Sequence, residues 1–257
     1  FGSSVGGTMA LYAARLSPGP LRLVVVGATH RPGAWASAQA AGQGIQEFAP
    51  QRVLIEMDPT ELGLADEHSD YRPVLQAAEA CGAPVVPIDR DSLGTTKKMV
   101  KALFLHPVQS LQAALVPQRL DSEEDLARHR SALAAKAPDI YRLLTVEREE
   151  YMCYKTLLDL EASGASSVAL CLGPGHVAPL RGQLEACLRA GPFLAEHARE
   201  LPRLAEAFDV KPGPAPAETL EAKIVRLERD DTSGVPLVVG GILLMLAPIA
   251  LFRVVRG

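Results

Sequence analysis

The chain lacks several features that would assign it to a class at once. It has no asparagine, hence no N-glycosylation sequon, which counts against a secreted domain. Its four cysteines are widely spaced without a CxxC pair, which argues against a zinc knuckle or a disulfide framework. The formal net charge is −4, so we expect no nucleic-acid partner. An HExxH motif is also missing, which excludes an ordinary zincin.

What the chain does have is the composition of a globular protein. Hydrophobic residues make up 48% and charged residues 22% of its 257 residues, which is enough for one sizeable domain with an appendage. We expect four parts: a poorly defined N-terminal segment (1–20), an α/β domain (21–209), a proline-rich linker (210–233) and an apolar segment (234–252).

Short apolar runs alternate with helical patterns along the predicted domain. Buried strands are predicted at 21–27, 52–57, 83–88 and 168–172, and helices at 34–48, 71–81, 177–189 and 194–208. Strands separated by helices pair in parallel through right-handed crossovers. The stretch 92–160 has helical spacing throughout, with a helix from about 138 to 160. We therefore predict an α/β fold with a mostly parallel central sheet, flanking helices and a long helical insertion.

The last part of the sequence suggests a membrane location. The segment 234–252, GVPLVVGGILLMLAPIALF, has no charged residue and is long enough to span the hydrocarbon core of a bilayer. Arg253 and Arg256 follow at once. We therefore expect one C-terminal transmembrane helix that acts as a tail anchor. The basic end favours the mitochondrial outer membrane, with the domain facing the cytosol.

Three polar residues follow predicted strands and form the candidate site. His30 comes after GAT, His176 after GPG, and Glu56 closes the strand between them in sequence. Parallel strands bring their carboxyl ends to one edge of a sheet, so these side chains should meet in one crevice. Two imidazoles and a carboxylate can hold a divalent first-row metal, which activates water for hydrolysis. The metal would be manganese, cobalt, zinc or iron.

Other interpretations of these residues stay open. Each histidine could be a hydrogen-bonded structural residue, and Glu56 could cap the following turn or pair with Arg90. The run 147–150 is typical of a solvated helix face, although Arg148 lies next to an apolar stripe and could reach a carboxylate or a substrate. The remaining histidines (His68, His106, His129 and His197) are expected at the surface.

The motifs together resemble a known family. The order GATH (27–30), IEMD (55–58), IDRD (88–91), EREEYM (147–152) and GPGH (173–176) is similar to the TraB/PrgY family, which includes the Tiki proteins. The resemblance covers about 21–189. It implies a fold like that of the erythromycin-esterase and ChaN-like group, and it implies His30, Glu56, Arg148 and His176 as the functional positions.

The resemblance also implies an activity. Tiki members are described as metal-dependent proteases and bacterial members restrain peptide pheromones, so a peptide or protein substrate is expected. In this reading His30, Glu56 and His176 hold the metal. Glu56 could instead be the general base, and Arg148 stabilises an oxyanion or orients the glutamate. Two alternatives remain: a non-catalytic regulator or tether at the membrane, and an ectodomain behind a removed signal peptide, as in Tiki proteins.

Overall fold

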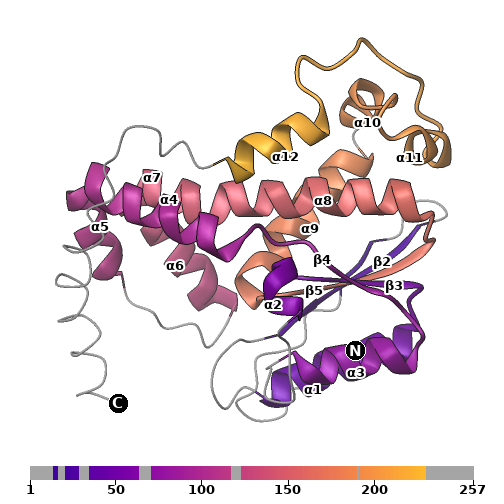
Figure 1. The fold of residues 1–257 in the computed structure, drawn as a ribbon, viewed down its shortest axis with the longest axis horizontal. Helices are drawn as coiled ribbons and strands as arrows, with labels where there is room; N and C mark the ends of the chain where they lie inside the picture. Colours follow the sequence, from indigo (N-terminus) through magenta and orange to yellow (C-terminus); the bar gives the residue numbers. More distant parts are fainter. Residues whose placement is uncertain are drawn as a thin grey trace.

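The centre of the protein is a small twisted sheet. The computed structural model describes residues 14–16, 21–28, 35–63, 71–116, 123–189 and 191–229. Within these ranges a five-stranded sheet has the order β1-β2-β5-β3-β4 (Figure 1). β1 pairs antiparallel with β2, and the other four strands pair in parallel. The strands are β1 (Ala14–Leu16), β2 (Arg22–Gly27), β3 (Arg52–Ile55), β4 (Val85–Pro87) and β5 (Ser167–Leu172).

Helices cover both faces of this sheet. Alternate side chains of a strand point to opposite faces, so Val24 of β2 packs in one core and Leu23 in the other. The first core contains Ile45 of α1 (Trp35–Phe48) and Val74 of α3 (Arg72–Ala80). The second contains residues of α8 (Glu147–Ser163) and α9 (Pro174–Arg189). All six residues of β5 are buried, as expected for the middle strand of a sheet covered on both sides.

A group of helices connects β4 to β5 and lies to the side of the sheet (Figure 1). It contains α4 (Ser92–Leu105), α5 (Pro107–Ala114), α6 (Glu123–Lys136), α7 (Pro138–Tyr141) and a short π-helix η1 (Arg142–Val146), which runs directly into α8. The predicted helical insertion is therefore confirmed, and its last helix extends from Pro138 to Ser163. The short helix α2 (Pro59–Gly63) follows β3.

Two expectations for the end of the domain need revision. The predicted helix at 194–208 is two short helices, α10 (Pro192–Glu196) and α11 (Pro202–Ala207), because Pro202 disfavours a helical residue before it. The segment expected to be a linker contains α12 (Leu220–Glu228), which packs on α8. Its Leu220, Ile224 and Leu227 are buried.

The predicted transmembrane helix has to be corrected. Among the described residues no helix is long and apolar enough to cross a membrane. The segment to which the prediction applied, 234–252, lies outside the described residues. The fold class is accordingly an α/β domain with a small, mostly parallel sheet and many helices. Its predicted location at a membrane stays a prediction.

Candidate functional site

The carboxyl ends of three parallel strands form one edge of the sheet, and polar groups follow each of them. Glu56 follows β3, Asp89 follows β4 after one intervening residue, and Gly173 follows β5. The first turns of α8 and α9 begin at the same edge and bring Arg148 and His176 to it. We call Glu56, Asp89, Arg130, Arg148, Glu149 and His176 the strand-end site.

Glu56 lies at the centre of the strand-end site. Only 6% of the residue is exposed, and its Oε2 accepts a hydrogen bond of 2.6 Å from the backbone N–H of Gly173. A Cβ added to Gly173 would lie 3.3 Å from that same oxygen, so glycine at this position lets the backbone approach the carboxylate. The other carboxylate oxygen, Oε1, is 2.8 Å from Nη2 of Arg148.

Arg148 joins two carboxylates. Besides its ion pair with Glu56, its Nε donates to both oxygens of Asp89 at 2.9 and 3.0 Å. Burial alone would lower the pKa of Arg148, but the hydrogen bonds to Asp89 and the charge of Glu56 outweigh it and raise the pKa above the usual value. Arg148 therefore stays charged and holds the two acidic groups in fixed positions.

His176 is held by a second buried carboxylate. Its Nδ1 lies 2.9 Å from Oε1 of Glu149, whose side chain is only 2% exposed. Arg130 donates to both oxygens of Glu149, at 2.6 and 3.1 Å. Burial would raise the pKa of Glu149, but the hydrogen bonds from His176 and Arg130 outweigh it, so the pKa lies below its usual value. Glu149 is thus an anion that accepts from His176.

The orientation of His176 follows from this contact. When the ring is neutral and Nδ1–H is donated to Glu149, the lone pair of the ring is on Nε2. That nitrogen lies 3.6 Å from Oε1 of Glu56. Two ligands of a tetrahedral zinc ion lie about 3.3 Å apart, given bond lengths near 2.0 Å. Glu56 and His176 therefore fit as two donors to one divalent ion, and Glu149 provides the outer hydrogen bond that metal-binding histidines commonly have.

The third predicted ligand is not placed. His30 lies outside the described residues, so its part in the site stays a prediction. Within the ranges that are described, no group of three or more His, Cys, Asp or Glu side chains is arranged to hold a metal ion. The structure thus brings together Glu56, Arg148 and His176 and leaves the complete ligand set untested.

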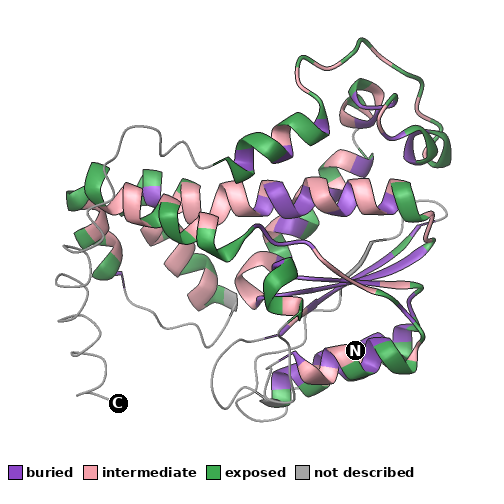
Figure 2. Cartoon of the chain, in the orientation of Figure 1, coloured by how far each residue is buried: buried purple, intermediate pink, exposed green. Residues whose placement is uncertain are grey.

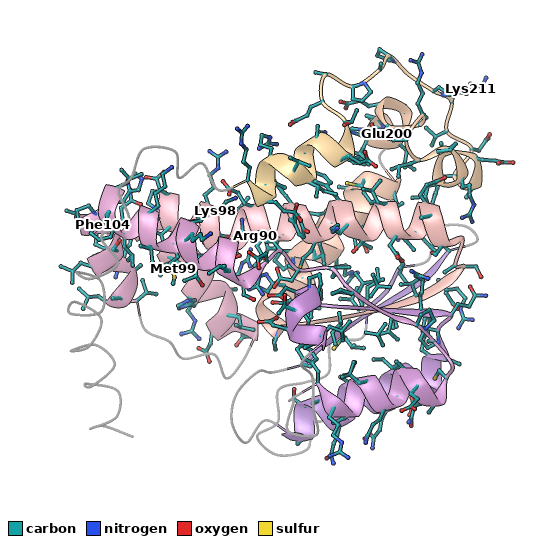
Figure 3. The ribbon with its side chains drawn as sticks, in the orientation of Figure 1. Arg90, Lys98, Met99, Phe104, Glu200 and Lys211 are labelled. Carbon is teal, nitrogen blue, oxygen red and sulfur yellow. The ribbon has the colours of Figure 1, made fainter. Side chains whose placement is uncertain are left out.

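Several other contacts differ from the sequence-based interpretation. Glu149 is buried, whereas the run 147–150 was expected to be a solvated face. Arg90 (labelled in Figure 3) does not pair with Glu56: its Nη2 donates to the carbonyl of Leu143 at 2.7 Å, and its Nη1 lies 3.7 Å from Glu147. No local spacing in the sequence signals these contacts, because Arg90 and Leu143 are 53 positions apart.

One expected surface histidine is part of the core. His197 has 0% exposure, and its Nδ1 lies 2.8 Å from Oε1 of Glu200. The ring of Phe193 packs against that of His197 at an angle of 44°, with ring centroids 4.6 Å apart. The prediction failed because His197 lies in a turn between two short helices, α10 and α11, where the sequence pattern indicated one exposed helix face.

A cavity adjoins the strand-end site. It has a volume of about 380 Å³ and lies between α6, α7 and the first turns of α9. Arg130 and Gly175 line it, and Nη1 of Arg130 donates a hydrogen bond of 2.9 Å to the carbonyl oxygen of Gly175. Most of the other lining is apolar: Leu126, Ala127, Ala134, Pro174, Val177, Ala178 and Pro179. The cavity is suited to an apolar side chain.

Comparisons with known proteins give no independent assignment. No family model, no curated protein and no solved structure matches the chain.

Proposed function

We propose that the chain is a TraB-type hydrolase that cleaves a peptide or protein substrate with the help of a divalent metal ion. One observation carries the proposal: a buried, ionised Glu149 fixes Nδ1 of His176, so that Nε2 faces Glu56 at 3.6 Å. A histidine fixed in this tautomer beside a second carboxylate is the arrangement that hydrolytic sites use for metal binding or for proton transfer.

The side chains have separate roles in this proposal. His30, Glu56 and His176 would hold the ion, which supplies a Lewis acid and a water molecule that ionises near neutral pH. Arg148 keeps Glu56 oriented and presents a fixed positive charge to an oxyanion that develops on the substrate. The cavity beside Arg130 and Gly175 receives an apolar side chain of the peptide and positions the scissile bond.

A second function, from a different class, is also supported by an observation. Each buried carboxylate of the strand-end site already has an arginine partner: Glu56 and Asp89 pair with Arg148, and Glu149 pairs with Arg130. A closed network of this kind can serve to fix the fold alone. In that case the domain is a non-catalytic regulator that binds a partner.

The first experiment measures metal content and cleavage together. The full chain is purified without chelators and analysed for manganese, cobalt, zinc and iron, next to the His176→Ala and Glu56→Gln variants. We expect close to one ion per chain in the wild type and none in either variant. A peptide library screened with the same samples should show cleavage only in the metal-containing protein.

A matched control separates this site from other histidines. His106 is partly exposed and pairs with Asp139, away from the strand-end site. The His106→Ala variant should keep both metal and cleavage. A folded wild-type protein that takes up no ion after divalent metals are added would contradict the peptidase proposal and favour the regulator.

The Glu149→Gln variant tests whether Glu149 positions His176. Glu149 contacts His176 and is not one of the predicted ligands, so the variant should still bind metal. Its metal affinity should be lowered about 10- to 100-fold, as for other outer hydrogen-bond partners. Metal titration measures this affinity without any substrate. An unchanged affinity would show that the Glu149 contact is only structural.

A further inference from the structure

Two of the four cysteines meet between helices α8 and α9. Cys153 lies in α8 and is 1% exposed, whereas Cys187 lies in the last turn of α9 and is half-buried. Their thiol groups are hydrogen-bonded to each other. Most of α8 is buried or half-buried, because α9 and α12 pack against it (Figure 2). The two thiols therefore contact each other where two neighbouring helices pack.

The surrounding core fixes this contact. Cys153 belongs to the same core cluster as Leu157, one turn further along α8, and Leu184, which precedes Cys187 by three residues in α9. Cys187 packs against that cluster from its edge. Residues one turn apart share a side of a helix, so the packing of these leucines holds both cysteines at the α8–α9 contact. Thiols held in contact in this way are placed to form an S–S bond of about 2 Å.

The two thiols differ in how readily they ionise. The hydrogen bond from Cys153 lowers the pKa of Cys187 below its ordinary value, although burial opposes ionisation, and the positive charge of Lys223 lowers it further. The same hydrogen bond raises the pKa of Cys153, and burial adds to that effect. A thiolate reacts with oxidants and a thiol does not. Cys187, which is also the more exposed of the two, is therefore the nucleophile, and Cys153 is the protonated partner behind it.

Lys223 of α12 is held in a fixed position near this pair. Its Nζ lies 3.1 Å from Nε2 of His197, and it lies 5.7 Å from the ring centre of Tyr154 and 5.8 Å from that of Phe193. Both aromatic rings pack against the core cluster on which Cys187 also packs. The packing of α12 on α8 thus supplies the nearby cation that is typical of reactive cysteines.

We propose that Cys153 and Cys187 form an oxidation site at which hydrogen peroxide closes a disulfide between α8 and α9. The thiolate of Cys187 attacks one peroxide oxygen, so that an S–O bond forms, the O–O bond breaks, and the hydroxide that leaves takes up a proton to become water. Sγ of Cys153 then attacks Sγ of Cys187: the S–S bond forms, the S–O bond breaks, and the hydroxyl group leaves as water with the proton of Cys153. Two thiols and one peroxide thus give one disulfide and two water molecules.

The proposal is independent of the strand-end site and is tested on the full chain. The protein is reduced, freed of reductant and treated with hydrogen peroxide, and its remaining thiols are alkylated after unfolding. Mass spectrometry of an unreduced digest then identifies linked peptides. We expect two fewer free thiols than in the untreated protein and a linked pair of peptides that contain Cys153 and Cys187. Dithiothreitol should restore both thiols.

Cysteine variants separate the two steps. Cys187→Ala should leave Cys153 reduced, because the buried thiol is not the nucleophile. Cys153→Ala should stop at the sulfenic acid of Cys187, which dimedone traps. Cys81 is the matched control: it is partly exposed and packs on the core at the other face of the sheet, so Cys81→Ser should form the disulfide as the wild type does.

A lysine variant tests the role of the nearby charge. Lys223→Gln should slow the loss of thiols by about two- to tenfold, because a smaller fraction of Cys187 is ionised. Lys211→Gln removes the same charge at an exposed position between α11 and α12 (Figure 3) and should leave the rate unchanged. Circular dichroism checks that each variant is folded.

Three results would overturn the proposal. The first is a folded wild-type chain in which Cys153 and Cys187 stay reduced while Cys81 reacts. The second is no loss of thiols at a peroxide concentration that oxidises free cysteine. The third is a disulfide that joins Cys187 to a second copy of the chain, which electrophoresis without reductant detects.

Discussion

Arg130 and Glu149 form the buried ion pair on which the position of His176 depends. The side chain of Glu149 is 2% exposed and that of Arg130 is 22% exposed. The phenolic oxygen of Tyr141 accepts a further hydrogen bond from Arg130 at 3.0 Å, which fixes the guanidinium. A buried pair of this kind is costly to break, because the remaining partner stays in the interior without its counter-charge.

The Glu149→Gln variant should therefore be less stable by about 3 kcal/mol at pH 7. The folded-state pKa of Glu149 is lowered from about 4.5, so its stabilising contribution is complete above that pH and is lost as the pH falls through the folded-state value. The stability difference between wild type and variant should shrink below about pH 4.5. Urea unfolding at a series of pH values measures it.

A surface carboxylate supplies the control for this prediction. Glu185 pairs with Arg181 one turn away on α9, and both side chains are partly exposed. Glu185→Gln should cost less than about 0.5 kcal/mol at every pH. Equal losses for the two variants would mean that the Glu149 pair contributes no more than a surface contact.

Asp58 connects two helices near the strand-end site. Its Oδ1 accepts hydrogen bonds from the N–H groups of Thr60 and Glu61 in α2, at 2.7 and 2.8 Å, and its Oδ2 accepts one of 3.0 Å from the N–H of Ser92 in α4. Burial opposes ionisation of Asp58, but these hydrogen bonds outweigh it and lower its pKa. One carboxylate thus stabilises the first turn of both helices.

Asp58→Ala should destabilise the protein by about 2 to 3 kcal/mol, because four donors, the hydroxyl of Ser92 among them, lose their acceptor. Asp91→Ala removes one N-cap bond to Gly94 at an exposed position and should cost about 1 kcal/mol. Circular dichroism during urea unfolding compares the two. A smaller loss for Asp58→Ala than for Asp91→Ala would show that the Asp58 contacts do not form in solution.

Helices α1 and α3 approach each other closely at Gly42. A Cβ at this position would lie 2.7 Å from the carbonyl oxygen of Pro73, which is backbone and cannot move aside without shifting α3. Gly42→Ala should therefore destabilise the fold by about 1 to 3 kcal/mol despite the better helix propensity of alanine. Gly182 in α9 has open space around it, so Gly182→Ala should stabilise the fold by about 0.5 to 1 kcal/mol. Thermal unfolding of both variants tests the contrast, and two changes of the same sign would contradict it.

The whole molecule should respond to metal if Glu56 and His176 bind one ion between two parts of the fold. Glu56 follows the end of β3 and His176 lies in the first turn of α9, so only the folded chain brings the two side chains together. The ion therefore binds the folded chain in preference to the unfolded chain. A divalent ion at 100 times its dissociation constant should add about 2.7 kcal/mol, which raises the Tm by about 5 to 10 °C. Differential scanning calorimetry should show this rise for wild type and for His106→Ala. A similar rise in His176→Ala would place the ion elsewhere.

The sequence by itself determined the four parallel strands, the helical segments that separate them and the edge of the sheet where polar groups gather. Apolar runs predict strands because a parallel strand covered on both faces needs apolar side chains throughout, as β5 shows. The apolar run that ends at Ile55 places Glu56 at the end of a strand, whichever residues surround it in the folded protein. The helix predicted at about 138–160, which the structure extends to Ser163, was recognisable because its periodicity is local.

The tertiary structure alone decided which charges pair. Arg148 joins Asp89 across 59 positions of sequence, and Arg130 and Glu149 come from different helices. The burial of His197 and the packing of α12 on α8 likewise depend on segments far apart in the chain. A sequence pattern records which face of an element is apolar, whereas the partner of a buried charge is set by where the elements meet in space.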